Sequence, residues 1–279
     1  RAAADAGIDI KKLDHKFKKI GSLPQSGSRK FSVSFRETPE GERWAFIAGY
    51  ADALISSVKK IQVLNRYENA MFFEIGAIRE SMDLMAKSGL SVLAVCSRKI
   101  ENRENLLDSR GDFKALLDLN LVGLVGLKDS LIENCQLLLS ESRMAGLRAV
   151  LVSGDYVISA KSFGVEVGIV QKNKVHEILE GKEIDAFDSK ELSYRIRNVD
   201  ILSRASFDQK LKVSKAWAEN GECVCVFGDS PDDAQVLRES DIGISAENAA
   251  DSAKDASDII ILEGGFKSFL EAIKESRAL

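Results

Sequence analysis

The stretch Cys223-Val-Cys-Val-Phe227, followed at once by Gly228-Asp-Ser-Pro-Asp-Asp233, decides the fold. A short apolar run that ends in glycine, proline and acidic residues is typical of a buried strand followed by a polar loop. Similar runs alternate with segments of helical spacing from residue 121 onwards. They are Leu121–Leu127, Arg148–Val152, Asp200–Leu202, Ile242–Ile244 and Ile259–Leu262, and Ser130–Ala145 has helical spacing. This alternation predicts a parallel sheet covered by helices on both faces.

The residues before this region have a different pattern. The sequence predicts a hairpin of Phe31–Phe35 and Trp44–Ile47, and a strand at Leu90–Cys96. Helices are expected at Ala2–Ile20, Asp52–Lys60 and Glu74–Ser88. Helices mixed with hairpins predict an α+β domain with an antiparallel sheet.

Length and charge limit the possible functions. A chain of 279 residues suggests two domains, which we place at 1–118 and 119–279. Net charge is −4, so nucleic acid is not an expected partner. Residues 1–120 carry 20 basic and 16 acidic side chains, whereas the remaining residues carry 19 basic and 27 acidic ones. The basic first part could bind a polyanion and the acidic second part a divalent cation. The alternative is a chance imbalance between two solvated surfaces. His15 and His176 are too few for a histidine metal site, and the four cysteines form no disulfide framework.

Polar side chains follow three of the predicted strands. Ser153-Gly154-Asp155 follow one, Asp229 and Asp233 another, and Arg204 and Lys210 a third. Ligands of parallel sheets bind beyond the carboxyl ends of the strands. Carboxylates there could hold Mg²⁺ with a phosphate, and the lysine could contact the phosphate oxygens. Each cluster alone could also be a helix cap or a turn.

Several segments of the sequence resemble a known family, the P-type cation-transporting ATPases of the haloacid dehalogenase superfamily. The matching segments are Leu124–Asp129 ("GLKDP"), Leu151–Asp155 ("TGD"), Ser203–Lys210 ("ARVSPEQK"), Phe227–Ala234 ("GDGVNDA"), Asp241–Ile244 and Ala253–Leu262. From Leu121 onwards the resemblance is nearly continuous. Before Ser97 it is weaker, with Arg29–Val33 like the "RKxxSV" strand and Ile47–Asp52 in place of "KGAPE". The family implies a Rossmann-like phosphorylation domain at 119–279, preceded by a nucleotide-binding domain at 1–118.

The resemblance also implies roles for individual residues. Asp229 and Asp233 would hold Mg²⁺, whereas Ser153, Gly154, Asp155 and Lys210 would act on the phosphoryl group. Arg29, Lys30 and Gly49 would line the ATP site. The family couples ATP hydrolysis, through an aspartyl phosphate, to cation transport. Its soluble part faces the cytoplasm, and its cation ligands lie in membrane helices.

Several positions depart from the family pattern. No "DKTGT" aspartate occurs, so we expect this chain to be a fragment that lacks the first strand of its parallel sheet and is inactive alone. Gln25, Ala48 and Ser91 stand where the family has nucleotide contacts, and Asp232 replaces a neutral asparagine. Three hypotheses therefore remain: part of a cation pump, a soluble phosphatase, or a non-catalytic relative that acts as a binding module.

Overall fold

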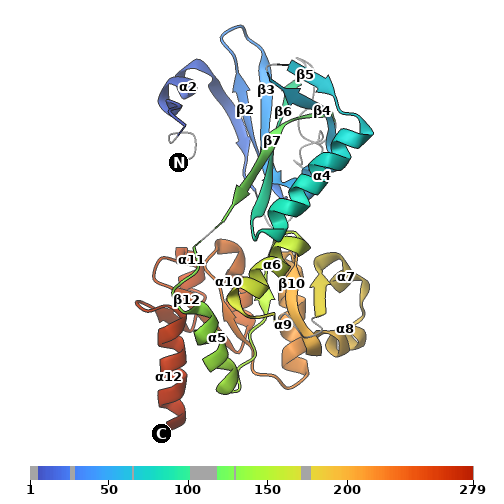
Figure 1. Cartoon of the computed structure of the whole chain (residues 1–279). Coiled ribbons are helices and arrows are strands. Elements are labelled where there is room, and N and C mark those ends of the chain that lie inside the picture. The colour runs from blue at the N-terminus through green and yellow to red at the C-terminus, as the bar shows by residue number, and fades with distance from the viewer. Residues whose placement is uncertain are drawn as a thin grey trace. The chain divides into compact units, whose positions relative to one another are not determined.

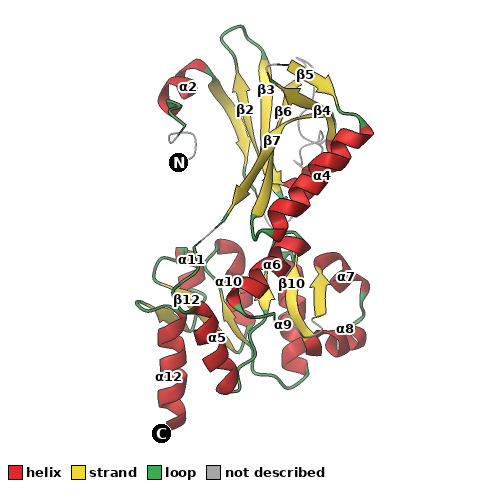
Figure 2. Ribbon diagram, viewed as in Figure 1, coloured by secondary structure: helices red, strands yellow, loops and turns green. Residues whose placement is uncertain are grey.

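The structure is a computed structural model that describes residues 6–25, 29–64, 66–100, 118–128, 130–170 and 177–278. The chain divides into two compact units, Arg1–Lys128 (unit 1) and Asp129–Leu279 (unit 2). Figure 1 shows them coloured along the chain, and Figure 2 shows that unit 1 is dominated by strands and unit 2 by helices around short strands.

Unit 1 contains a seven-stranded sheet in the order β1-β2-β3-β6-β7-β4-β5. Its strands are β1 Lys18–Leu23, β2 Phe31–Glu37, β3 Arg43–Tyr50, β4 Val58–Val63, β5 Arg66–Asn69, β6 Ser91–Ile100 and β7 Leu119–Leu127. Neighbours are antiparallel except β4 and β7, which run parallel. The predicted hairpin and the antiparallel sheet are therefore confirmed.

The core of unit 1 lies on one face of this sheet. Alternate residues of β2 and β3, such as Val33 and Ile47, are buried because successive side chains of a strand point to opposite faces. Helix α4, Phe72–Lys87, buries Met82 and Ala86. It packs closely on β7, since a Cβ atom at Gly126 would lie 2.8 Å from a side-chain atom of Met85.

Three expectations in unit 1 were wrong in part. Of the helix expected at residues 2–20, the described residues from 6 onwards are helical only over α2, Ile10–Lys16, and Ile20 lies in β1. Helix α3, Ala51–Leu54, passes through the 3-10 turn η1, Ile55–Ser57, into β4. Pairing of β1 with β2 and of β4 with β7 overrides the local helical pattern in both places. In addition, the strand over Leu121–Leu127 belongs to the sheet of unit 1, because β7 pairs with β6.

Unit 2 contains two parallel three-stranded sheets, β8-β10-β9 and β11-β12-β13. Their strands are β8 Leu151–Val152, β9 Glu177–Glu180, β10 Val199–Ser203, β11 Cys225–Phe227, β12 Ile242–Ala246 and β13 Ile259–Ile261. The helices are α5 Cys135–Met144, α6 Val157–Val167, α7 Gly181–Ala186, α8 Ser189–Arg195, α9 Phe207–Glu219, α10 Ala234–Glu239, α11 Asp251–Lys254 and α12 Phe266–Ala278, with 3-10 turns η2 Ile196–Asn198 and η3 Pro231–Asp233.

Helices cover both faces of the first parallel sheet. Leu202 on β10 packs into a cluster with residues of α7, α8 and α9, including Ile184 and Val213. Ile201, the adjacent residue, instead packs against Ala160 of α6 and Val170. In the second sheet, Val226 packs against Leu237 of α10 and Ala253 of α11. The predicted parallel strands with helices on their faces are thus present, in two sheets among the described residues.

In the described part of the chain, none of the helices is long and apolar enough to cross a membrane.

The fold of the described residues is mixed α/β, with one large, mostly antiparallel sheet and two small parallel ones. The boundary that the sequence placed at 118/119 stays a prediction.

Candidate functional site

The loop after β11 brings together a lysine and an aspartate. Lys210 lies in the first turns of α9, and its Nζ atom is 2.8 Å from Oδ1 of Asp233 at the end of η3. The two side chains are 29% and 14% exposed. Since α9 follows β10 and η3 follows β11, this ion pair joins the carboxyl ends of the two parallel sheets.

Asp233 is held on both carboxylate oxygens. Ser230 donates its hydroxyl to Oδ2 of Asp233 at 2.7 Å, and its backbone N–H donates to the same oxygen at 3.3 Å. Burial alone would raise the pKa of Asp233, but the hydrogen bonds from Lys210 and Ser230 outweigh it and hold the pKa below its ordinary value. The carboxylate is therefore fixed and ionised at neutral pH.

Gly228 makes this arrangement possible. A Cβ atom at this position would lie 2.7 Å from Cβ of Asp233 and 3.2 Å from Leu237, closer than real contacts allow. The backbone N–H of Gly228 donates to Ile244 of β12 at 3.0 Å, and the carbonyl of Asp229 accepts from Ala250 at 2.8 Å. The loop that carries Asp229 is thus fastened on two sides.

The segment after β8 forms a second small network. Ser153 donates its hydroxyl to Oδ2 of Asp155 at 3.0 Å and accepts from the Asp155 backbone N–H at 3.0 Å. The backbone N–H of Ser153 donates to Leu202 at 2.8 Å, and its carbonyl accepts from Ala205 at 3.4 Å. Ser153 is therefore fixed beside the carboxyl end of β10. Lys210 follows that end of β10 by a few residues.

Arg204, at the end of β10, contacts two residues that the sequence did not indicate. Its guanidinium lies 4.9 Å from the ring centre of Tyr156 and 3.7 Å from the carboxylate of Glu180. Arg204 also has a positive φ of 53°, which is uncommon for a residue other than glycine. Glu180 ends β9, a strand that the sequence pattern did not reveal because two of its four residues are glutamates.

The predicted metal ligands are only partly gathered. Asp229 and Asp233 belong to one loop, but within the described ranges no three His, Cys, Asp or Glu residues form a group that could hold a metal ion. Among the described residues, Asp155, Asp229 and Asp233 therefore do not form a group that could hold a metal ion, and their gathering at one edge of the sheet stays a prediction. Asp129 and His176 lie outside the described residues.

Unit 1 brings the three predicted nucleotide residues close together in the chain fold. Arg29 and Lys30 directly precede β2, and the carbonyl of Lys30 accepts from Tyr50 at 3.1 Å. Gly49 pairs with Phe31, and a Cβ atom on it would come within 2.6 Å of the Phe31 Cα atom. The need for glycine at position 49 therefore arises from the close approach of β2 and β3.

On the opposite face of the same sheet, several positions near Ala48 are apolar. Ala48 pairs with Val95, and Tyr50 pairs with Leu93, which in turn pairs with Val125. Val125 is 42% exposed. These positions show a half-exposed hydrocarbon surface where the family resemblance leads one to expect cationic contacts.

Comparison with known proteins shows what the chain is similar to. Residues 1–134 match the family described as P-type ATPase, cytoplasmic domain N. The chain is 28% identical to a calcium-transporting ATPase of Bacillus subtilis over 99% of its own length. It is 24% identical to calcium-transporting ATPase 1 of Saccharomyces cerevisiae over 98% of its length. A plasma membrane-type calcium-transporting ATPase 12 of Arabidopsis thaliana is 31% identical over 70% of this chain.

The chain is a relative of the P-type ATPases. The resemblance to P-type ATPases that the sequence indicates is thereby confirmed. The chain spans about 30% of the length of the Bacillus and Saccharomyces relatives, and 18% of the Arabidopsis one. Within unit 2, the sequence segments that resemble P-type ATPases include Lys210 on α9 and Asp233 on η3.

Proposed function

We propose that this chain is the nucleotide-binding and phosphorylation region of a P-type ATPase that couples ATP hydrolysis to cation transport across a membrane. The contact that carries the proposal is the 2.8 Å ion pair of Lys210 and Asp233. It sets a cation and two carboxylates, Asp229 and Asp233, at the carboxyl ends of parallel strands, where such sheets bind their ligands. The names of the relatives favour Ca²⁺ as the transported ion.

We further propose that the two small sheets are parts of one haloacid-dehalogenase-type sheet. Both are parallel, and β8 and β11 are edge strands. The Lys210–Asp233 contact brings their carboxyl ends to one place. One further parallel strand between β8 and β11 would join them, and in the family the acceptor aspartate belongs to such a strand. That strand would come from a segment of the polypeptide outside these 279 residues.

In this proposal each polar residue has a separate task. Lys210 offsets the negative charge that builds up on the phosphoryl oxygens, and the Ser153 hydroxyl with the Gly154 amide donates hydrogen bonds to them. In the structure the Ser153 hydroxyl donates to Asp155 at 3.0 Å, so it would have to turn away from Asp155 to donate to a phosphoryl oxygen. Arg29 and Lys30 attract the phosphates of ATP in unit 1. A phosphoryl group at the carboxyl ends would compete with Asp233 for the Lys210 ammonium.

The carboxylates of the loop after β11 would bind Mg²⁺ with modest affinity. Mg²⁺ prefers oxygen ligands and is usually held by one or two carboxylates together with waters and a phosphate. Asp229 and Asp233 provide two carboxylates, although Asp233 already accepts from Lys210 and Ser230. When bound, Mg²⁺ would neutralise charge on the phosphate oxygens. Replacing Asp229 by Asn should weaken Mg²⁺ binding in calorimetry.

The test measures ATP-driven uptake of labelled Ca²⁺ into sealed membrane vesicles. The vesicles contain the longer polypeptide of which, in this proposal, these residues are a part. Uptake that requires ATP and Mg²⁺ supports a pump. A second candidate is a non-catalytic relative, which is favoured by Ala48, Ser91 and Asp232 in place of the family's contacts. Vesicles with no ATP-dependent uptake and no phosphate release would indicate that candidate. Phosphate release from small phosphate esters by a polypeptide without membrane helices would instead indicate a soluble phosphatase.

A further inference from the structure

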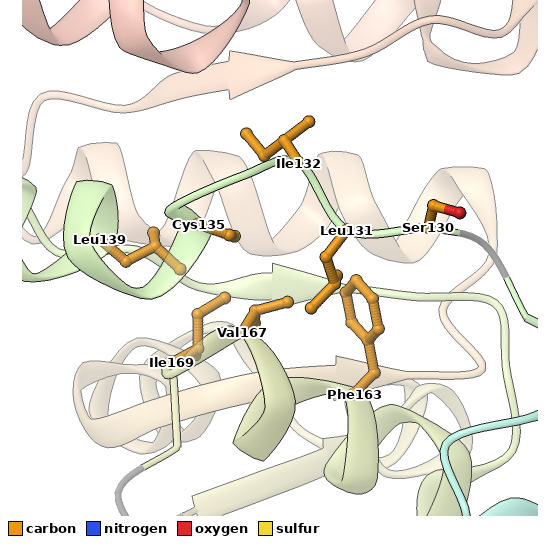
Figure 3. A pocket seen from close by; sticks show the side chains of 8 residues that line it. All are labelled: Ser130, Leu131, Ile132, Cys135, Leu139, Phe163, Val167 and Ile169. Carbon is orange, nitrogen blue, oxygen red and sulfur yellow. The ribbon is translucent and has the colours of Figure 1, made fainter.

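A cavity of about 320 Å³ lies in unit 2 between the segment that leads into α5 and the end of α6 (Figure 3). It is separate from the loop that carries Lys210 and Asp233. Its walls come from the first residues of unit 2, from α5 and from α6. The lining residues are Ser130, Leu131, Ile132, Cys135, Leu139, Phe163, Val167 and Ile169.

The lining is almost entirely hydrocarbon. Apart from Ser130 and Cys135, each lining side chain is aliphatic or aromatic, and none of the eight carries a fixed charge. In Figure 3, Leu131 and Phe163 point toward each other, and Ile132 points away from the other side chains. Burial raises the pKa of the Cys135 thiol, so this group is neutral at physiological pH. The cavity is open to solvent at Ile132, which is 55% exposed, and its walls offer an ion no opposite charge.

Hydrogen bonds hold the walls together. The side chain of Gln136 on α5 donates to the carbonyl of Glu166 near the end of α6 at 2.8 Å. Arg143, also on α5, donates to the carbonyl of Ile169 at 2.9 Å and to that of Gly168. The carbonyls of Glu166, Gly168 and Ile169 beside the cavity thus already have partners within the protein. A ligand would therefore meet carbon surface rather than unsatisfied polar groups.

We propose that this cavity binds a compact, uncharged, apolar molecule of about two fused rings. A cavity of about 150 Å³ lined by Leu, Ile and Phe accommodates benzene, so a volume about twice as large suits a naphthalene-sized ligand. A nucleotide would find no cation in the walls to pair with its phosphates. The site does not depend on the proposed ATPase function. Because Leu131 belongs to the first residues of unit 2, an occupant would hold that segment against α6.

The test uses the whole chain and 1-aminonaphthalene, a neutral fluorescent probe of the stated size. We expect saturable binding at one site. We also expect that the probe slows alkylation of Cys135 by a maleimide, read by mass spectrometry, and leaves the exposed Cys223 unaffected. Equal rates at Cys135 with and without saturating probe would overturn the proposal, because Cys135 lines the cavity.

A pair of variants localises the binding. Ile169→Phe adds a ring inside the cavity and should weaken probe binding about tenfold or more. Leu137→Phe is the matched control, because Leu137 lies on the same helix, α5, is 56% exposed and does not line the cavity. Equal affinity in the two variants would overturn the proposal. If Ile169→Phe fails to fold, the Cys135 protection in the native chain still decides the question.

Discussion

The ammonium group of Lys210 lies 2.8 Å from a carboxylate oxygen of Asp233, although the two residues belong to different β-α connections. One follows β10 and the other follows β11, so this contact links two sheets that share no backbone hydrogen-bond ladder among the described strands. It also gives the candidate site its fixed cation and its fixed anion.

Removing the lysine should destabilise the chain. Lys210→Met leaves the largely buried carboxylate of Asp233 without its cation, which we expect to lower the free energy of unfolding by about 1–3 kcal/mol. Lys215→Met is the control on the same helix, because the Lys215–Glu239 pair is 56% and 32% exposed and such pairs contribute about 0–1 kcal/mol. Chemical unfolding at pH 7 measures both. Equal losses in the two variants would show that the Lys210 pair has no special weight.

The same contact predicts a dependence on acid. The folded-state pKa of Asp233 lies below its ordinary value, so its contribution to stability is present above about pH 4 and is lost as pH falls through the folded-state pKa. Asp233→Asn should therefore be less stable than the native chain at pH 7, with the difference shrinking towards pH 3. Denaturant titrations at a series of pH values measure this. A difference that stays constant from pH 7 to pH 3 would argue against ionisation as the cause.

The glycine beside the pair should not tolerate a side chain. Gly228→Ala would force apart the Gly228 loop and Asp233, at an expected cost of about 1–3 kcal/mol. Gly123→Ala is the matched control, because a Cβ atom at Gly123 meets nothing within 4 Å. Its effect should be small, or stabilising because alanine lowers the conformational entropy of the unfolded chain. Thermal unfolding of the two variants side by side gives the comparison, and equal melting temperatures would contradict the packing argument.

Nucleotide binding to this chain should be weak. Gln25, Ala48 and Ser91 replace a stacking ring and two cations, each worth on the order of 1 kcal/mol or more, so we expect a dissociation constant for ATP no tighter than the millimolar range. Lys30→Ala should abolish what remains. Isothermal calorimetry with ATP checks this, and micromolar affinity in the native chain would refute it.

How far the sequence predicts the fold depends on how local each element is. The strand over Cys225–Phe227 and the helix that ends just before Gly89 carry strong local signals, namely an apolar run and a glycine, which takes a φ of 77° in the structure. The strands β1 and β9 do not, because β1 is mostly exposed and β9 is half glutamate. Their strand conformation comes from pairing with β2 and β10, which only the folded chain reveals.

The candidate site was predictable in its residue types and less so in its contacts. The motifs around Asp229 and Lys210 identify the region, since chemistry-bearing residues follow each strand. No pattern in the sequence indicates that Lys210 pairs with Asp233 or that Arg204 stacks on Tyr156. Both contacts depend on how α9, η3 and α6 pack, which depends on side chains far apart in the sequence.

Phosphorylation of the longer polypeptide by labelled ATP, in the presence of Mg²⁺ and Ca²⁺, is the measurement on which the proposed function depends most. We predict an acid-stable, hydroxylamine-sensitive label that is strongly reduced in Lys210→Met and retained in Lys215→Met. No label in the native polypeptide, or equal label in the two variants, would contradict the proposed function.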